Sequence, residues 1–309
     1  MKLNRIMTVL FVAGLSVSAI MGCSDHEPAS GAYAKTTVTV QPEGLFDAEE
    51  DAGDASAADA SSGDSGGEAL GVGTFAGRVV FDGAAPGPKV EIAKGTSAKD
   101  PAVCAADSDI LSESLVVDSS GGLANVFIYL DKAPRGAEAS DVPQEKVIFD
   151  QKGCVFLPHA LLVRAEQMLF VINSDAVAHN THTEPSRNTK LNTNVAPNDA
   201  NGIDMTYAKG EKAPVKVVCD IHPWMTAWHL PVDHQFAALT GADGSFKIEG
   251  LPAGTHKFRI VHEGRFLDRG LPVSIEADET ESREIKFGAG DLAAAPRTQS
   301  KIARLTAGR

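Results

Sequence analysis

The sequence predicts an all-β protein, and three observations carry that prediction. Short apolar runs, rich in β-branched and aromatic residues, recur between residues 71 and 287. Turns built from Gly, Pro and Asp separate these runs, and no long helical period competes with them. This stretch of roughly two hundred residues is long enough for one large hydrophobic core or two smaller ones.

The N-terminal segment has the pattern of a targeting signal. Lys2 and Arg5 precede an apolar stretch that ends at Gly22 and Cys23. This pattern resembles a bacterial lipoprotein signal with its lipobox. The resemblance implies removal of residues 1–22, lipidation of Cys23 and a membrane-anchored protein of the bacterial cell envelope, facing the periplasm or the exterior. An ordinary signal peptide and an uncleaved membrane anchor are the alternatives.

Residues 23–70 are predicted to form a disordered acidic tether. Between residues 43 and 69 the chain is mostly Ala, Asp, Glu, Gly and Ser, with hardly any large apolar side chain. Such a composition buries too little surface to offset the entropy of ordering. The formal net charge of -13 lies mostly on this tether. We expect no nucleic-acid partner for so acidic a chain.

The apolar runs that follow are predicted strands. The first three span residues 78–81, 124–130 and 146–149. Residues 168–174 form the next one. The β-branched run at 213–218 is expected to be a buried strand that delivers the following residue, a cysteine, to one end of a sandwich.

Four side chains near the ends of the last two strands are suited to one metal ion. Cys219, His222 and Met225 stand with two residues between each pair, and His179 lies upstream. A thiolate, two imidazoles and a weak thioether make the trigonal site typical of blue copper, whereas zinc has little use for the Met. We therefore predict a copper site. The alternative is a buried thiol, two hydrogen-bonded histidines and a Met in the core.

The segments VINSDAVAHN and VVCDIHPWM resemble the two ligand segments of the cupredoxin family, in its plastocyanin-like and amicyanin-like members. The resemblance covers roughly residues 145–233. It implies a Greek-key β-sandwich with one type 1 copper per chain. The implied ligands are His179, Cys219, His222 and Met225. It also implies that Asn180 ties the two ligand loops together.

Neighbours of the ligands add two expectations. Asp220 departs from the family pattern, because many members have a hydroxyl residue there, and an acid beside the thiolate favours Cu(II). Pro223, Trp224 and Trp228 are predicted to form an apolar rim around an exposed edge of His222, with ordinary sandwich packing as the alternative.

The remaining histidines are less specific. His182 stands three residues after His179 and is an alternative ligand or part of a second metal site. His159 and His229 are interpreted as surface or hydrogen-bonded residues. A second site requires His159, His182 and His229 to converge.

Each of the four cysteines has an expected role. With Cys23 lipidated and Cys219 bound to metal, Cys104 and Cys154 are the pair left in an oxidising compartment. We predict a disulfide between them, and two separate buried thiols are the alternative.

The C-terminal part predicts a second, smaller β-sandwich. LTGADGSFKIEGLPAGTHKFRIVHEG alternates turns with two strands, and it resembles the second half of a carboxypeptidase-regulatory-like, transthyretin-type module. Residues 71–93 resemble the first half. We expect the two halves to assemble around the cupredoxin-like segment, with a tandem order as the alternative.

These boundaries give the predicted organisation. A copper domain spans residues 71–233, of which 71–130 belong either to it or to the second sandwich. The regulatory-like sandwich spans 234–288, and a disordered tail spans 289–309.

Several enzyme classes lack their signatures here. Only one cysteine stands in the ligand loop, whereas a binuclear copper centre needs two. The several H-x-H pairs of a multicopper oxidase are missing. A histidine brace needs an N-terminal His, whereas the expected lipoprotein processing leaves Cys23 at the N-terminus. No Ser-His-Asp, P-loop or paired-acid signature stands out. We therefore expect no enzyme.

The predicted function is single-electron transfer in the cell envelope, with a redox protein as donor and another as acceptor in transient contact. A copper carrier or storage protein uses the same ligands and is one alternative. A structural or carbohydrate-binding lipoprotein with a vestigial site is the other.

Overall fold

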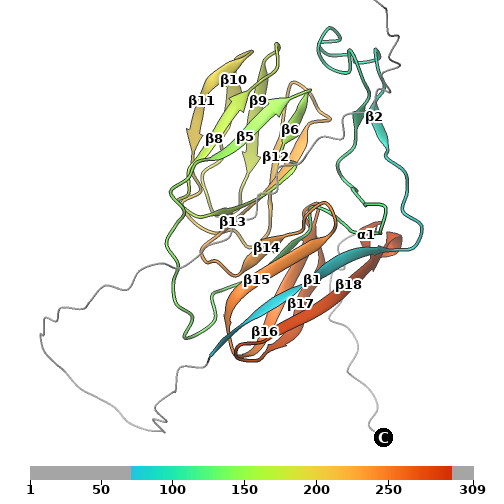
Figure 1. The fold of residues 1–309 in the computed structure, drawn as a ribbon. Helices are drawn as coiled ribbons and strands as arrows, with labels where there is room; N and C mark the ends of the chain where they lie inside the picture. Colours follow the sequence, from blue (N-terminus) through green and yellow to red (C-terminus); the bar gives the residue numbers. More distant parts are fainter. Residues whose placement is uncertain (1–70, 294–309) are drawn as a thin grey trace, which may run out of the picture. The chain divides into compact units, whose positions relative to one another are not determined.

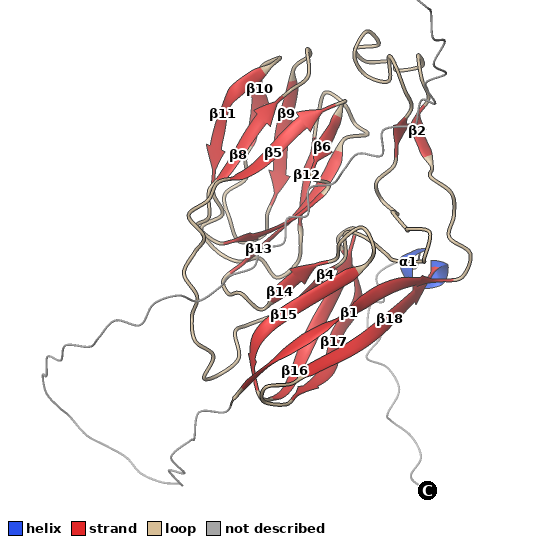
Figure 2. Cartoon of the chain, viewed as in Figure 1, coloured by secondary structure: helices blue, strands red, loops and turns tan. Residues whose placement is uncertain are grey.

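The structure, a computed structural model, describes residues 71–293. The predicted signal peptide, the acidic tether, Cys23 and residues 294–309 lie outside the described residues. The all-β prediction is confirmed: apart from loops and turns, the described part forms strands and a single five-residue helix (Figures 1 and 2). No helix in this part is long and apolar enough to cross a bilayer.

Nine consecutive strands form what we call the central sandwich. Its first sheet has the order β10 (Asn192–Val195), β9 (His179–Glu184), β12 (Val215–Val218), β13 (Thr226–Val232), β7 (Ala160–Arg164). Its second sheet has the order β11 (Asp199–Met205), β8 (Leu169–Asn173), β5 (Val147–Lys152), β6 (Val155–Leu157). Both sheets contribute buried side chains to one core, for example Val217 from β12 and Phe149 from β5.

Seven strands form a second unit, the outer sandwich. One sheet has the order β15 (Ser245–Pro252), β1 (Val72–Asp82), β18 (Thr280–Gly288). The other has the order β14 (Ala237–Leu239), β4 (Phe127–Leu130), β16 (Gly254–His262), β17 (Arg265–Ile275). A separate core lies between them, with Phe75 and Phe258 in tilted ring contact at 4.8 Å between centroids. The short strands β2 (Val90–Ile92) and β3 (Ile110–Leu111) pair with each other.

The order of these strands along the chain decides where residues 71–130 belong. β1 pairs with β15 and, in parallel, with β18, and β4 pairs with β14 and β16. The hydrogen bonds therefore place β1 and β4 in sheets of the outer sandwich, and the central sandwich follows between β4 and β14. The range of 71–233 expected for the copper domain thus includes two strands that pair in the outer sandwich, as in the alternative that assigns residues 71–130 to the second sandwich.

Two element boundaries differ from the predicted ones. The strand expected from residue 124 starts at Phe127, because Asn125 has a left-handed φ of 62° that interrupts the extended backbone. The tail expected to be disordered from residue 289 begins with α1 (Ala289–Ala293). The Gly288 amide donates to Asp291 Oδ2 at 2.9 Å, which satisfies one free amide at the start of this helix.

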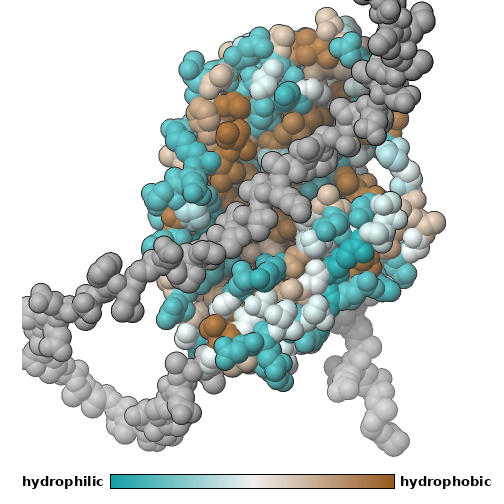
Figure 3. All heavy atoms as spheres, in the orientation of Figure 1, coloured by the Kyte–Doolittle hydropathy of each residue, from teal (hydrophilic) through white to brown (hydrophobic). Residues whose placement is uncertain are grey.

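The central sandwich carries apolar residues on part of its outer surface. Figure 3 shows them gathered over the sheet that contains β5 and β8, where Ile148 is 57% exposed and pairs with Phe170. The Lys146 ammonium lies 5.0 Å from the centre of the Phe170 ring. This face is turned away from the core.

Candidate metal centre

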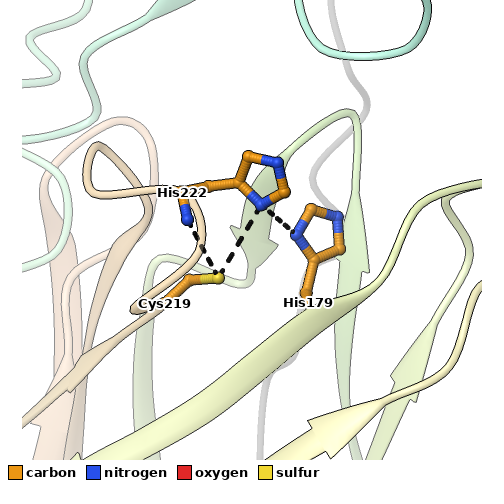
Figure 4. Close-up of side chains that lie close together, drawn as sticks. All are labelled: His179, Cys219 and His222. Carbon is orange, nitrogen blue, oxygen red and sulfur yellow. Dashed lines mark hydrogen bonds between the residues drawn. The ribbon is translucent and has the colours of Figure 1, made fainter. Parts of the chain in front are cut away.

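The candidate centre lies at one end of the central sandwich, where β9 begins and β12 ends. His179 is the first residue of β9, and Cys219 directly follows β12. His222 lies in the loop after Cys219. Figure 4 shows the three side chains pointing toward one another, with His179 Nδ1 2.9 Å from His222 Nδ1 and Cys219 Sγ 3.8 Å from His222 Nδ1. Each residue is buried, with at most 2% exposure.

Neighbouring strands and a tight loop bring these atoms together. β9 and β12 are antiparallel neighbours, so their adjacent ends meet at one pole of the sandwich. In the loop, the His222 amide donates to Cys219 Sγ at 3.4 Å, and the Met225 amide donates to the His222 carbonyl at 2.9 Å. The Cys219 amide donates to the Met225 carbonyl at 3.3 Å, which closes the loop. The backbone thus fixes the spacing of the three predicted ligands in this loop.

Met225 is the fourth predicted ligand, and its side chain is 1% exposed within the same core as Cys219. Met225 and Trp224 line a groove of about 360 Å³, together with His159 and Trp228. The loop therefore supplies a buried thioether to the core that also contains the Cys219 thiol.

The surroundings favour a thiolate at Cys219. Burial raises the pKa of this thiol, but a hydrogen bond from His179 and others from backbone amides outweigh it and hold the pKa below its ordinary value. One of these amides is that of Asn180, at 3.5 Å from Sγ. Thiolate is the form of cysteine that binds metals.

The surroundings shift the pKa values of the two histidines in opposite directions. Burial lowers the pKa of His179, but hydrogen bonds with Asp175 and Cys219 raise it overall to about 9. Burial and the neighbouring charge of His179 lower the pKa of His222. These opposite shifts mean that a proton at the pair is held by His179 in preference to His222.

Sequence reasoning missed two carboxylates that hold the outer nitrogens of these histidines. His179 Nε2 lies 2.8 Å from Asp175 Oδ2, and His222 Nε2 lies 2.8 Å from Asp100 Oδ2. Asp175 stands only four residues before His179, and that proximity was an available signal. Asp100 offered none, because it lies 122 residues from His222.

Asn180 and Asp220 connect the two ligand segments. Asn180 Oδ1 accepts the Asp220 amide at 2.6 Å, and Asn180 Nδ2 donates to Asp220 Oδ2 at 2.9 Å. The Asp220 carboxylate also accepts from Asn192 at 3.0 Å and pairs with His182 at 3.1 Å. These polar groups thus hydrogen-bond to the Asp220 carboxylate on the surface side of the loop.

His182 does not join the ligands. It lies three residues beyond His179 in the same strand, and an odd separation places two side chains on opposite faces of a strand. His159 contacts Glu263 Oε1 at 2.7 Å, and His229 Nδ1 contacts the Tyr207 hydroxyl at 3.1 Å. His159, His182 and His229 therefore have separate partners and form no common site.

The edge of His222 is covered, contrary to the expected exposed edge with an apolar rim. His222 has 0% exposure, because Asp100 lies against its outer nitrogen. Trp224 packs against the imidazole: its ring lies edge-on to that of His222 at 5.1 Å between centroids, and its Nε1 donates to the Cys154 carbonyl.

The disulfide between Cys104 and Cys154 is formed and buried. Among the described residues Cys219 is the free cysteine. The Cys154 amide donates to Asp175 Oδ2 at 2.8 Å, the same oxygen that contacts His179. The disulfide is therefore adjacent to the candidate metal centre.

The chain has similar solved structures but no matching family model or curated sequence. A copper-containing nitrite reductase from Thermus scotoductus SA-01 is 15% identical, with a TM-score of 0.26, over 30% of this chain and 25% of the reductase.

Two cupredoxins are also among the similar solved structures. A purple cupredoxin from Nitrosopumilus maritimus is 14% identical, with a TM-score of 0.23, over 28% of this chain and 98% of that protein. Amicyanin from Paracoccus versutus is 16% identical, with a TM-score of 0.25, over 34% of this chain and 96% of that protein.

Proposed function

We propose that the protein is a type 1 copper protein that carries single electrons between redox partners of the bacterial cell envelope. One observation carries the proposal: Cys219 Sγ and one nitrogen each of His179 and His222 converge in a buried cluster, with one ligand atom from each within 4.8 Å of the others. Copper is the metal that best suits a thiolate, two imidazoles and a nearby thioether.

The surrounding groups fit such a metal. Both Nδ1 atoms point inward, while both Nε2 atoms contact carboxylates that fix the orientation of each ring. Cys219 would supply the thiolate to the metal, and Met225 would supply a thioether. Copper, when bound, supplies the one-electron couple between Cu(II) and Cu(I).

The ligands have little freedom to rearrange. The loop from Cys219 to Met225 is closed by backbone hydrogen bonds, and Asn180 ties it to the start of β9. A rigid ligand set limits reorganisation when the metal changes oxidation state, which suits electron transfer without turnover of a substrate. We propose no enzymatic activity.

The location of the protein belongs to the same proposal. The N-terminal pattern supports lipidation at Cys23 and a long acidic tether, which together hold the folded part near a membrane and let it reach partners over a wide volume. Contacts with the electron donor and acceptor are small and transient, as in electron-transfer encounters generally.

The test is spectroscopic. Cu(II) is added to the purified protein and to its Cys219→Ser variant, and visible absorption and electron paramagnetic resonance spectra are recorded. We expect an intense blue thiolate band and narrow copper hyperfine splitting, both lost in the variant because the thiolate is gone.

His182→Gln is the matched control, since this histidine points away from the site and its replacement is expected to leave both signals unchanged. A colourless complex that is insensitive to the loss of Cys219 would refute the electron carrier and favour copper handling or a structural role.

A further inference from the structure

Residues 93–109, which connect β2 and β3, cover the outer edge of His222 and are called the cover segment here. Among the described residues, the cover segment forms hydrogen bonds only within itself, with one exception. The exception is Asp100, whose Oδ2 lies 2.8 Å from His222 Nε2.

Asp100 is placed by its own backbone. It has a left-handed φ of 46°, and its carbonyl accepts the amides of Val103 and Cys104, each at 2.9 Å. The Asp100 side chain is 41% exposed, whereas that of His222 is fully buried. The carboxylate therefore lies between the imidazole and solvent.

Cys104 anchors this turn to the central sandwich. It is bonded to Cys154, 50 residues along the chain, and is fully buried. On the other side of the bond, the amides of Gly153 and Cys154 donate to Asp175, which holds His179. One disulfide thus joins the segment that carries Asp100 to the turn whose amides hold Asp175, the partner of His179.

We propose that Asp100 is a positioning residue for His222, and that the Cys104–Cys154 disulfide locks the cover segment over the metal centre. With the bond formed, the segment keeps metals and thiol reagents away from Cys219. β2 and β3 have only three and two residues, so the segment has little other strand pairing to hold it.

Reduction opens the site in this proposal. A dithiol reductant gives two electrons and two protons to the Cys104–Cys154 bond, which becomes two thiols, while the reductant becomes a disulfide. The cover segment then keeps its apolar packing but loses its covalent anchor, and access to Cys219 increases. The consequence for copper exchange rests on the proposed function, whereas the access to Cys219 does not.

The first experiment measures modification of Cys219 by an aromatic disulfide reagent in the metal-free full chain, with the site identified by peptide mass spectrometry. Wild type is compared with the double variant Cys104→Ser, Cys154→Ser and with Asp100→Ala. We expect both to react at least about tenfold faster, equivalent to ~1.4 kcal/mol of easier opening. Asp107→Ala is the control, since Asp107 is an exposed residue of the same segment and should react like wild type.

A second readout separates positioning from general loosening. The imidazole nitrogen NMR signals of His222 report which nitrogen carries the proton, and we expect the Nε2-protonated form in wild type and in Asp100→Glu but a mixture in Asp100→Ala. Equal modification rates in wild type, Asp100→Ala and the double variant would overturn the proposal. If the double variant does not fold, Asp100→Ala with the disulfide intact still decides the point.

Copper exchange is measured last, as release to a chelator with and without prior dithiol treatment. Faster release after treatment is expected. If the protein binds no copper but Cys219 is still modified faster in Asp100→Ala and in the double variant than in wild type, the proposed function is refuted. The role of the cover segment in shielding Cys219 then still holds. If dithiol treatment leaves the rate of copper release unchanged, the Cys104–Cys154 disulfide does not control copper exchange.

Discussion

Asp175 shows how one residue supports the candidate centre without binding the metal itself. Its carboxylate accepts the amides of Gly153 and Cys154 and also contacts His179 Nε2. Burial raises the pKa of Asp175, but these hydrogen bonds outweigh it and leave the pKa below its ordinary value. The charged carboxylate thereby fixes the orientation of the His179 ring and makes its Nδ1 atom a stronger electron-pair donor to a metal.

Asp175→Asn is therefore expected to lower copper affinity by about 10–100-fold, because the amide keeps an acceptor but loses the charge. Affinity is measured by competition with a chelator of known strength. Asp150→Asn is the control, since that carboxylate hydrogen-bonds Ser174 and touches neither histidine. Equal losses in the two variants would mean that the charge near the site, and not the contact with His179, sets affinity.

His229 is a buried histidine outside the candidate centre, and it predicts a pH dependence of stability. It is fully buried, with Tyr207 at Nδ1 and the Phe149 ring edge-on at 4.4 Å between centroids. Burial lowers its pKa from 6.5 to about 3. The folded state therefore resists protonation while the unfolded chain accepts the proton, so this group destabilises the fold as pH falls from 6.5 toward 3.

The free energy of unfolding, measured by urea titration across this pH range, is expected to fall less steeply in His229→Asn than in wild type. The difference in slope is about 1.4 kcal/mol per pH unit for one proton. Asn is chosen because its side chain reaches the Tyr207 hydroxyl from a position similar to Nδ1. Parallel slopes in the two proteins would show that His229 is protonated in the folded state.

At the scale of single elements, the turn from Gly241 to Gly244 links parts of the chain that are distant in sequence. The Val79 amide of β1 donates to the Gly244 carbonyl at 2.9 Å, and Gly244 has a left-handed φ of 78°. A methyl group at Gly244 would collide with the Val79 carbonyl oxygen and the Leu123 amide.

Gly244→Ala is expected to destabilise the outer sandwich by about 1–3 kcal/mol from backbone strain, with the collision adding to this loss. Thermal and urea unfolding measure the effect. Gly87→Ala is the control, because a methyl group there meets nothing within 4 Å. A loss no larger than that of the control would mean that the turn can shift without cost.

The sequence predicted several strands and the grouping of the candidate ligands, but not the contact that covers His222. β8, β12, β15 and β16 were predictable, because alternating apolar runs between turns are local signals. The grouping of His179 with Cys219 and His222 was predictable from residue type and spacing. The contact between Asp100 and His222 was not, because it depends on where a disulfide-anchored segment without strong periodicity folds.

For the whole molecule, strand pairing shows that one sandwich is assembled from both ends of the folded chain. β1 lies between β15 and β18 in its sheet, and β4 pairs with β16 in the other. The central sandwich lies between β4 and β14 in sequence. The outer-sandwich strands that precede it must therefore pair with strands that follow it. Long-range pairing of this kind has to overcome a larger loss of chain entropy than a local hairpin does.

A chain limited to residues 234–288 is therefore expected not to fold cooperatively. Without β1, neither β15 nor β18 has its partner, and Phe75 and Val79 are missing from the core between the sheets. Circular dichroism during heating should show no cooperative transition for this fragment, whereas the full chain should show one. A synthetic peptide of residues 71–84 added to the fragment supplies β1 but not β4, so partial recovery of strand signal is expected. A cooperative transition and well-dispersed amide NMR signals from the fragment alone would show that the C-terminal strands are an independent domain and that β1 is dispensable.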